Sequence, residues 1–156
     1  MATRVISLVN LKGGVGKTSI AHALATGLHR SNPRTLAIDL DPQRNLSYAY
    51  NALAPHLNAY DLLQGRTLQD KCIMPTEQGD IIPASEELAT ADDTLTPNAD
   101  GIGRKLEVVL EPLKYYYDYI IIDTPPAINS LTSNALFASD EIIIVTQADI
   151  FSLQGI

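Results

Sequence analysis

The feature that most constrains the fold is a glycine-rich turn at residues 10–18, NLKGGVGKT, which separates two segments with different hydrophobic patterns. Residues 4–9, RVISLV, are aliphatic and β-branched, as in a strand that is buried on both faces. Residues 17–30 instead place apolar side chains four residues apart, which is typical of an amphipathic helix. The chain therefore opens with a strand, a tight turn and a helix, which predicts an α/β fold.

The rest of the chain continues this alternation of buried strands and helices. We expect strong strands at residues 35–40, 117–123 and 141–147, and a short strand at 81–84. Helical patterns fill the intervening segments: 46–64 in broken pieces, 85–95 with Ser85 as its N-cap, 103–115 with its end kinked or frayed by Pro112, and 129–138. This order predicts one domain over residues 1–156, with a mainly parallel sheet flanked by helices on both faces.

Composition limits the classes of protein to which the chain can belong. Hydrophobic residues make up 46% of the 156 residues, a globular share, but no run approaches the roughly 20 apolar residues that a membrane helix needs. We expect no signal peptide, and the single cysteine, Cys72, excludes a disulfide framework, so the predicted location is the cytoplasm. The net charge of −7 leaves no basic stripe for non-specific nucleic-acid binding.

Residues 72–103 form an acidic stretch, with seven Asp or Glu side chains and no Lys or Arg. A solvated outer face and a docking surface for a basic partner both fit this charge pattern. On either interpretation, the stretch is an unfavourable surface for DNA, because the phosphate backbone attracts Lys and Arg and repels carboxylates.

The glycine-rich turn has the composition of a phosphate cradle. Gly13, Gly14 and Gly16 let the backbone curl so that successive N–H groups face an anion, and the positive end of the following helix adds to the attraction. Lys17 is placed to reach the β- and γ-phosphates of a nucleotide, and Thr18 to offer its hydroxyl to Mg²⁺. The alternative is a glycine turn that joins strand to helix without a ligand.

Carboxylates stand at the ends of two of the expected strands, where ligands bind in parallel sheets. Asp123 ends the apolar run YIIID, and an acid in that position needs a partner such as the Mg²⁺ shell, unless it caps the next element. Asp39 and Asp41 flank Leu40, so an extended chain points both carboxylates toward the phosphates. One then holds a metal-bound water and the other orients an attacking water, unless both are solvated turn residues.

Together these segments resemble the ParA/MinD family of deviant Walker A (SIMIBI) P-loop ATPases, and most of all its ParA/Soj partition branch. The strongest matches are KGGVGKT at 12–18, DLDPQ at 39–43 with Asn45, and YDYIIIDTPP at 117–126. Weaker matches are DLLQG at 61–65, IIPA at 81–84, NAL at 134–136 and FSLQG at 151–155. The resemblance implies a P-loop NTPase fold and runs in order along essentially the whole chain.

The resemblance also assigns roles to individual residues. It implies that Lys17 binds phosphate, that Asp41 orients the hydrolytic water, and that Lys12 is the signature lysine, which reaches the partner's phosphates across an ATP-bound homodimer. The implied metal site consists of Thr18, Asp39 and Asp123. The implied nucleotide contacts are Lys12, Gly13, Gly14, Val15, Gly16, Lys17, Thr18 and Ser19.

The function that the resemblance implies is an ATP-binding dimerisation switch that positions or segregates DNA or other cargo. It would be a weak Mg²⁺-dependent ATPase, stimulated by a ParB-like or other adaptor, with any DNA contact made through a region outside this chain. The alternatives are an ATP-dependent metabolic ligase or cyclase on the same scaffold, and a nucleotide-binding module without turnover. Two departures from the family stand out: Arg44 occupies a position that is usually glycine, and the chain is shorter, so we expect an N-terminal portion of a longer domain with an incomplete sheet.

Overall fold

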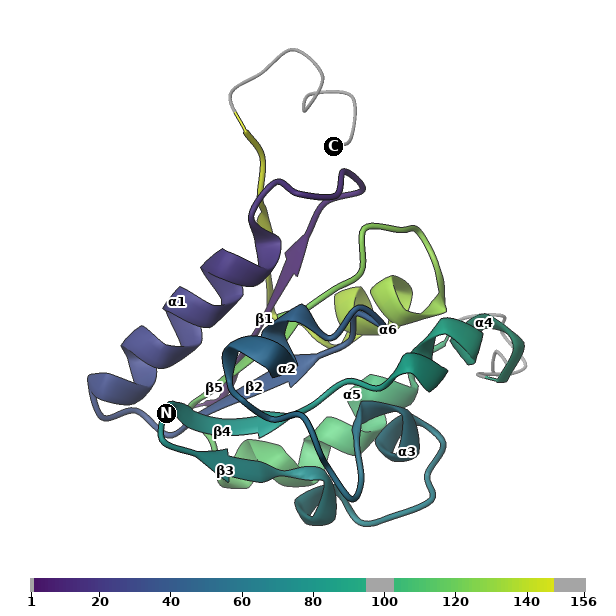
Figure 1. Ribbon diagram of the computed structural model, residues 1–156. Helices are drawn as coiled ribbons and strands as arrows, with labels where there is room; N and C mark the ends of the chain where they lie inside the picture. Colours follow the sequence, from purple (N-terminus) through teal and green to yellow (C-terminus); the bar gives the residue numbers. More distant parts are fainter. Residues whose placement is uncertain (1, 95–102, 148–156) are drawn as a thin grey trace.

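The sheet of the computed structural model is the expected mainly parallel one (Figure 1). The structure describes residues 2–94 and 103–147. Six strands lie in the order β3-β4-β2-β5-β1-β6, and all neighbours are parallel except the pair β3 and β4. The strands are β1 (Arg4–Val9), β2 (Thr35–Asp39), β3 (Met74–Thr76), β4 (Gly79–Ile82), β5 (Tyr119–Asp123) and β6 (Glu141–Ile144).

Helices cover both faces of the sheet, as expected. The α-helices are α1 (Lys17–Arg30), α2 (Asn45–Ala49), α3 (Ala59–Leu63), α4 (Ala91–Thr94), α5 (Lys105–Leu110) and α6 (Ser130–Ala138). Short 3₁₀ helices are η1 (Gln69–Cys72), η2 (Glu86–Thr90) and η3 (Glu111–Tyr115). Alternate side chains of each strand face opposite layers, so Ile121 packs with α1 and α2, whereas Ile120 and Ile122 pack with α3, α5 and α6.

Several local expectations need correction. The helix expected at 85–95 is instead η2 followed by α4, and the Ser85 side chain makes no capping bond. The helix expected at 103–115 ends at Leu110 and tightens into η3, in which Pro112, which has no N–H, lies in the first turn. The strand at 81–84 begins at Gly79, and the one at 141–147 ends at Ile144.

Two further comparisons with the sequence complete the fold. The antiparallel strand β3 was not expected, because it has only three residues and contains Pro75, which is tolerated on an edge strand. The FSLQG match at 151–155 and most of the loop expected at 97–103 lie outside the described residues.

The register of the sheet brings the candidate site together. Strands β1, β5 and β2 are parallel neighbours, so their carboxyl ends lie at one edge, next to the start of α1. Asp39 at the end of β2 is the direct register partner of Asp123 at the end of β5. The two carboxylates are therefore equivalent in the sheet, although they lie 84 positions apart in the sequence.

Candidate nucleotide and magnesium site

The glycine-rich turn adopts a backbone that requires glycine at two positions. Gly14 has φ 76° and Gly16 has φ 100°, in the left-handed region that other residues rarely adopt. A Cβ atom at either position would meet nothing within 4 Å, so the requirement comes from the backbone and not from lack of space. Gly16 is also the N-cap of the 14-residue helix α1, whose first N–H groups are thus directed at the turn.

Asn10 fixes the start of the turn, and the sequence analysis did not single it out. Its Nδ2 donates to the backbone oxygen of Val145 at 2.7 Å, and its Oδ1 accepts from the Lys12 N–H at 2.8 Å. Gln147 adds a contact from the same segment, because its Nε2 donates to the Gly14 oxygen at 3.2 Å. The segment that follows β6 therefore holds the turn, a long-range link that no local motif reveals.

Lys17, Thr18 and Asp123 come together beneath the turn. Lys17 is only 7% exposed, and burial lowers the pKa of its ammonium, while the nearby carboxylates of Asp123 and Asp41 act in the opposite direction. The Thr18 Oγ1 donates to the Asp123 Oδ2 at 2.6 Å. The structure thus brings Lys17, Thr18 and Asp123 together, while their roles toward phosphate and Mg²⁺ stay predictions.

Asp123 is fully buried and only half partnered. Its Oδ1 has no hydrogen-bond partner within the described part of the chain. Burial raises the pKa of its carboxyl to about 7, and the neighbouring carboxylates of Asp39 and Asp41 add to the rise, while Thr18 and Lys17 oppose it. A buried acceptor without a donor costs free energy unless a ligand such as a cation satisfies it.

Asp39 is equally buried, but the protein satisfies both of its oxygens. Oδ2 accepts from the Ser47 N–H at 2.8 Å and from the Ser47 hydroxyl at 2.7 Å, and Oδ1 accepts from the Asp41 N–H at 3.1 Å. Burial still raises the pKa of Asp39 to about 6, because it outweighs these hydrogen bonds. Ser47, on α2, was missed in the sequence because nothing there shows that α2 folds back onto β2.

Of the three candidate carboxylates, Asp41 lines the cavity, whereas Asp39 and Asp123 lie behind its lining. Small-molecule sites typically have volumes of about 300–1,000 Å³. This cavity has a volume of about 440 Å³ and is lined by Gly13, Gly14, Gly16, Lys17, Thr18, Ser19, Asp41, Gln43, Asn45 and Pro126. The strand β2 ends at Asp39, so Asp41 lies beyond it, and the shared direction of the two carboxylates stays a prediction. The Asp41 Oδ1 accepts from the Gln43 N–H at 2.9 Å, as in an Asx turn.

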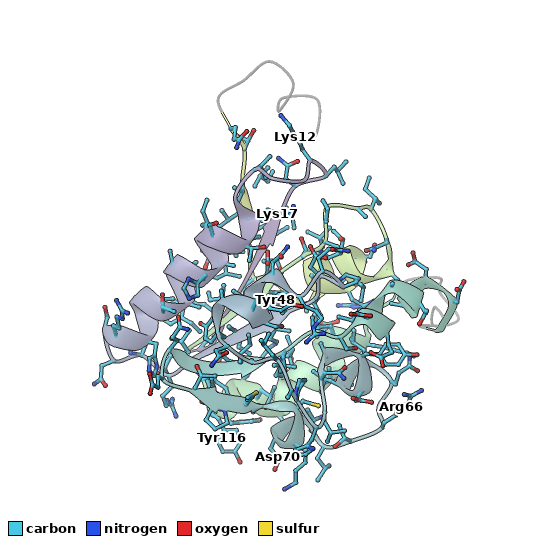
Figure 2. All side chains as sticks on the ribbon, viewed as in Figure 1. Lys12, Lys17, Tyr48, Arg66, Asp70 and Tyr116 are labelled. Atoms are coloured by element: carbon cyan, nitrogen blue, oxygen red, sulfur yellow. The ribbon has the colours of Figure 1, made fainter. Side chains whose placement is uncertain are left out.

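The remaining predicted residues fall in different places. Figure 2 shows Lys12 at the outer end of the turn and Lys17 deeper, next to the body of the molecule. Lys12 does not line the cavity of its own chain. Val15 is 6% exposed and packs in the core with α1, so only its backbone is available to a nucleotide.

The donor set fits Mg²⁺. In the described residues, no three His, Cys, Asp or Glu side chains form a metal cage. Mg²⁺ is typically held by one or two carboxylates together with substrate phosphates and waters, and not by a complete protein cage. The Thr18 hydroxyl and the half-partnered Asp123 carboxylate, beside a phosphate cradle, are such a partial site.

Comparison with known proteins identifies the family. The model of a family described as an AAA domain matches residues 3–156. The chain belongs to this family. Among its relatives is the chromosome partitioning protein ParA of Myxococcus xanthus (strain DK1622), which is 39% identical over 158 residues, and the alignment covers 98% of this chain and 55% of that protein. The ParA/Soj resemblance is thereby confirmed, and this AAA-domain chain spans about half the length of that relative.

Solved structures agree with this assignment of the AAA-domain chain. Cobyrinic acid a,c-diamide synthase from Mycobacterium smegmatis, with bound ADP and magnesium, has a TM-score of 0.91 at 30% identity, over 99% of this chain and 64% of that one. A plasmid partition protein from Borrelia burgdorferi has a TM-score of 0.88 at 30% identity, over 99% and 69%. Across residues 2–94 and 103–147, no helix is long and apolar enough to cross a membrane.

Proposed function

We propose that this chain binds ATP with Mg²⁺, hydrolyses it slowly to ADP and phosphate, and uses the nucleotide to control the association of two copies. The observation that carries the proposal is the meeting of buried Lys17 with the Thr18–Asp123 pair, in which one carboxylate oxygen has no partner. The bound ADP and magnesium of the mycobacterial relative support the same ligands here.

In this proposal each side chain acts on a different part of ATP. Lys17 neutralises charge on the β- and γ-phosphates, and its burial strengthens that attraction. Thr18 and Asp123 hold Mg²⁺, which when bound offsets the negative charge that develops on the phosphate oxygens. Asp41 orients the water that attacks the γ-phosphorus, since the Gln43 N–H fixes one of its oxygens and leaves the other to accept from water.

The metal role of Asp39 remains a prediction from the family resemblance. Three protein donors already occupy its carboxylate, which has about four acceptor sites in all. One site is therefore left to accept a hydrogen bond from a metal-bound water, as the resemblance implies.

Lys12 gives the proposal its dimeric element. Lys12 lies at the outer end of the turn and does not line the cavity of its own chain. We therefore propose that its ammonium contacts the phosphates bound by a second copy. A lysine that enters across an interface stabilises transition-state charge in the manner of an arginine finger and couples ATP occupancy to association. The proposed role is a cytoplasmic switch that positions DNA or other cargo, with a ParB-like adaptor as stimulating partner and any DNA contact outside this chain.

An ATP-dependent ligase or cyclase is the second candidate, because cobyrinic acid a,c-diamide synthase superposes with a TM-score of 0.91. Such an enzyme transfers the γ-phosphate to an acceptor substrate, so it should release phosphate only when that substrate is present. The switch should turn over ATP without an acceptor. Phosphate release from ATP and Mg²⁺ alone therefore separates these candidates, and its absence in an ATP-binding chain points to the acceptor-dependent enzyme or to a binding module without turnover.

Two variants test the switch directly. ATP with Mg²⁺ should shift the protein toward dimer in light scattering, and Lys12→Gln should abolish the shift while retaining ATP binding. Asp41→Ala should lose hydrolysis but keep ATP-dependent association. Association that is indifferent to both ATP and Lys12→Gln would reject the switch, and unchanged turnover in Asp41→Ala would reject Asp41 as the residue that orients water.

A further inference from the structure

A buried hydrogen-bond chain lies next to the cavity without lining it. Ser47 on α2 is fully buried, and its hydroxyl donates to the Asp39 Oδ2 at 2.7 Å. The same hydroxyl oxygen accepts from the Ala84 N–H at 2.9 Å, just after β4. Asp39 in turn accepts from the Asp41 N–H at 3.1 Å. The chain of bonds thus runs from Ala84 through Ser47 and Asp39 to the backbone of Asp41.

The central position of this chain requires a hydroxyl. Ser47 both donates and accepts, which an alanine cannot do and which a threonine reproduces. Ser47, Asp39 and Ala84 are each at most 1% exposed, so water does not replace a missing bond, and each bond is strong in these surroundings. The position of the Asp41 backbone therefore depends on a serine six residues further along the chain.

The segment after β4 holds the same loop from a second side. Arg44 approaches Glu86 with 3.9 Å between Nη1 and Oε1, and its Nη2 donates to the Leu53 oxygen at 3.1 Å. Ala84 lies two residues before Glu86. The loop from Asp41 to Ser47 is thus attached to residues 84–86 both inside the core and at the surface.

We propose that Ser47 is a positioning residue for the water-orienting carboxylate of Asp41, and that through Ser47 the geometry of Asp41 depends on the chain at residues 84–86. Ser47 does not line the cavity, so it acts through Asp39 and not on the nucleotide. This inference rests on the proposed ATP hydrolysis, but the position of the Asp41 loop can be measured without any nucleotide.

The effect of removing the hydroxyl follows from these contacts. Ser47→Ala leaves the Ala84 N–H without an acceptor and takes one donor from Asp39, so the Asp41 loop is less restrained. We expect kcat to fall about tenfold, or about 1.4 kcal/mol, while the KM for ATP stays within about twofold, as for an interaction made only in the transition state. Ser47→Thr should restore kcat, because it keeps the hydroxyl.

Ser7→Ala is the matched control. Ser7 is also a fully buried serine, but its hydroxyl contacts the Ala135 oxygen at 3.3 Å and the Ser139 hydroxyl at 2.5 Å, on the α6 side of the sheet. The same substitution there removes a buried hydroxyl without touching the Asp39 chain. It should leave both kcat and the Asp41 loop unchanged.

The test combines steady-state kinetics with amide hydrogen exchange on the nucleotide-free 156-residue chain. Ser47→Ala should speed exchange of the Asp41 and Ala84 amides at least about tenfold relative to wild type, through more frequent local opening. Ser47→Thr and Ser7→Ala should not. Wild-type exchange at Asp41 in Ser47→Ala, or an equal loss of kcat in Ser7→Ala, would overturn the proposal.

Failure of the proposed function and failure of a variant to fold can both be told apart from failure of this inference. If the wild-type chain does not hydrolyse ATP, the proposed ATPase activity is wrong. The exchange rate of the Asp41 amide in Ser47→Ala still decides whether Ser47 restrains the Asp41 loop. If Ser47→Ala does not fold, Ser47→Cys replaces it, because a thiol is a weaker donor in nearly the same space. Intermediate exchange at Asp41 in Ser47→Cys supports the proposal, and wild-type exchange rejects it.

Discussion

Asp39 and Asp123 are the same residue type, at the same register, on neighbouring parallel strands, and both are fully buried. Their surroundings nevertheless differ. Asp39 receives three hydrogen bonds from the protein, whereas Asp123 receives one from Thr18 and has an oxygen without a partner. The comparison shows that Asp39 joins three parts of the backbone, and the unpartnered oxygen of Asp123 supports its proposed role as a ligand for Mg²⁺.

The largest difference should appear in stability. Asp39→Ala leaves three buried donors without an acceptor, which outweighs the relief of its own poorly solvated charge. We expect the free energy of unfolding at pH 7.5 to fall by roughly 3 kcal/mol. Asp123→Ala removes one acceptor and relieves a poorly solvated charge, so its cost should be below about 1 kcal/mol. Urea denaturation of the nucleotide-free chain measures both values. Equal losses would contradict the division of roles.

The second prediction is that ionisation of Asp123 lowers the stability of the chain as the pH rises. Its pKa is raised to about 7 by burial, so the folded chain holds this proton more tightly than the unfolded chain, in which the pKa is near 3.8. The contribution to stability is therefore full below about pH 4 and is lost as the pH rises from there through 7, by roughly 4 kcal/mol. Asp123→Asn should flatten that fall. Asp39, whose pKa is about 6, should still titrate in this variant.

The third prediction is that the rate of ATP turnover requires the Asp123 carboxylate. Asp123→Asn removes the carboxylate proposed to hold Mg²⁺, and we expect ATP turnover to drop about 100-fold or more. The control is Asp118→Asn, which removes the partly exposed partner of Arg34 at 3.0 Å, just before the same strand, and should leave turnover unchanged. A phosphate-release assay measures both variants, and wild-type turnover in Asp123→Asn would exclude the proposed metal role.

The smallest expected effect concerns Arg44, at a position where the family resemblance implies glycine. Arg44 has φ 61°, a left-handed conformation, and its guanidinium lies 5.5 Å from the centre of the Tyr48 ring. Arg44→Ala keeps the strained backbone without this contact, whereas Arg44→Gly relieves the strain. We expect Arg44→Gly to be more stable than Arg44→Ala by about 1 kcal/mol in urea denaturation. Equal stabilities would show that the backbone conformation at this position carries no cost.

Much of this comparison could be predicted from the sequence. The apolar runs that end in Asp39 and Asp123 predicted parallel strands, and a parallel sheet brings the ends of its strands to one edge. The turn with Gly14, Gly16 and Lys17 could be assigned locally, because its spacing alone predicts a phosphate cradle. These features depend on short-range pattern and on general rules of sheet topology.

The difference between the two carboxylates could not be predicted, because it depends on long-range contacts. Two of the three hydrogen bonds to Asp39 come from Ser47, and the sequence pattern does not reveal that α2 returns to β2 at this point. Asn10 was missed for a similar reason, since its partner Val145 is 135 residues away. Local pattern placed the carboxylates at the site, and tertiary packing separated their roles.

Ligand-induced stabilisation tests the central claim most directly. At 100 times its Kd, Mg·ADP should raise the free energy of unfolding of the wild-type chain by about 2.7 kcal/mol. Asp39→Asn should start from a lower stability but retain most of this increment, whereas Asp123→Asn should start near wild type and lose the Mg²⁺-dependent part. Urea denaturation of both variants, with ADP in the presence and absence of Mg²⁺, supplies the comparison. Equal increments in the two variants would contradict the claim that Asp123 contributes more than Asp39 to binding the ligand.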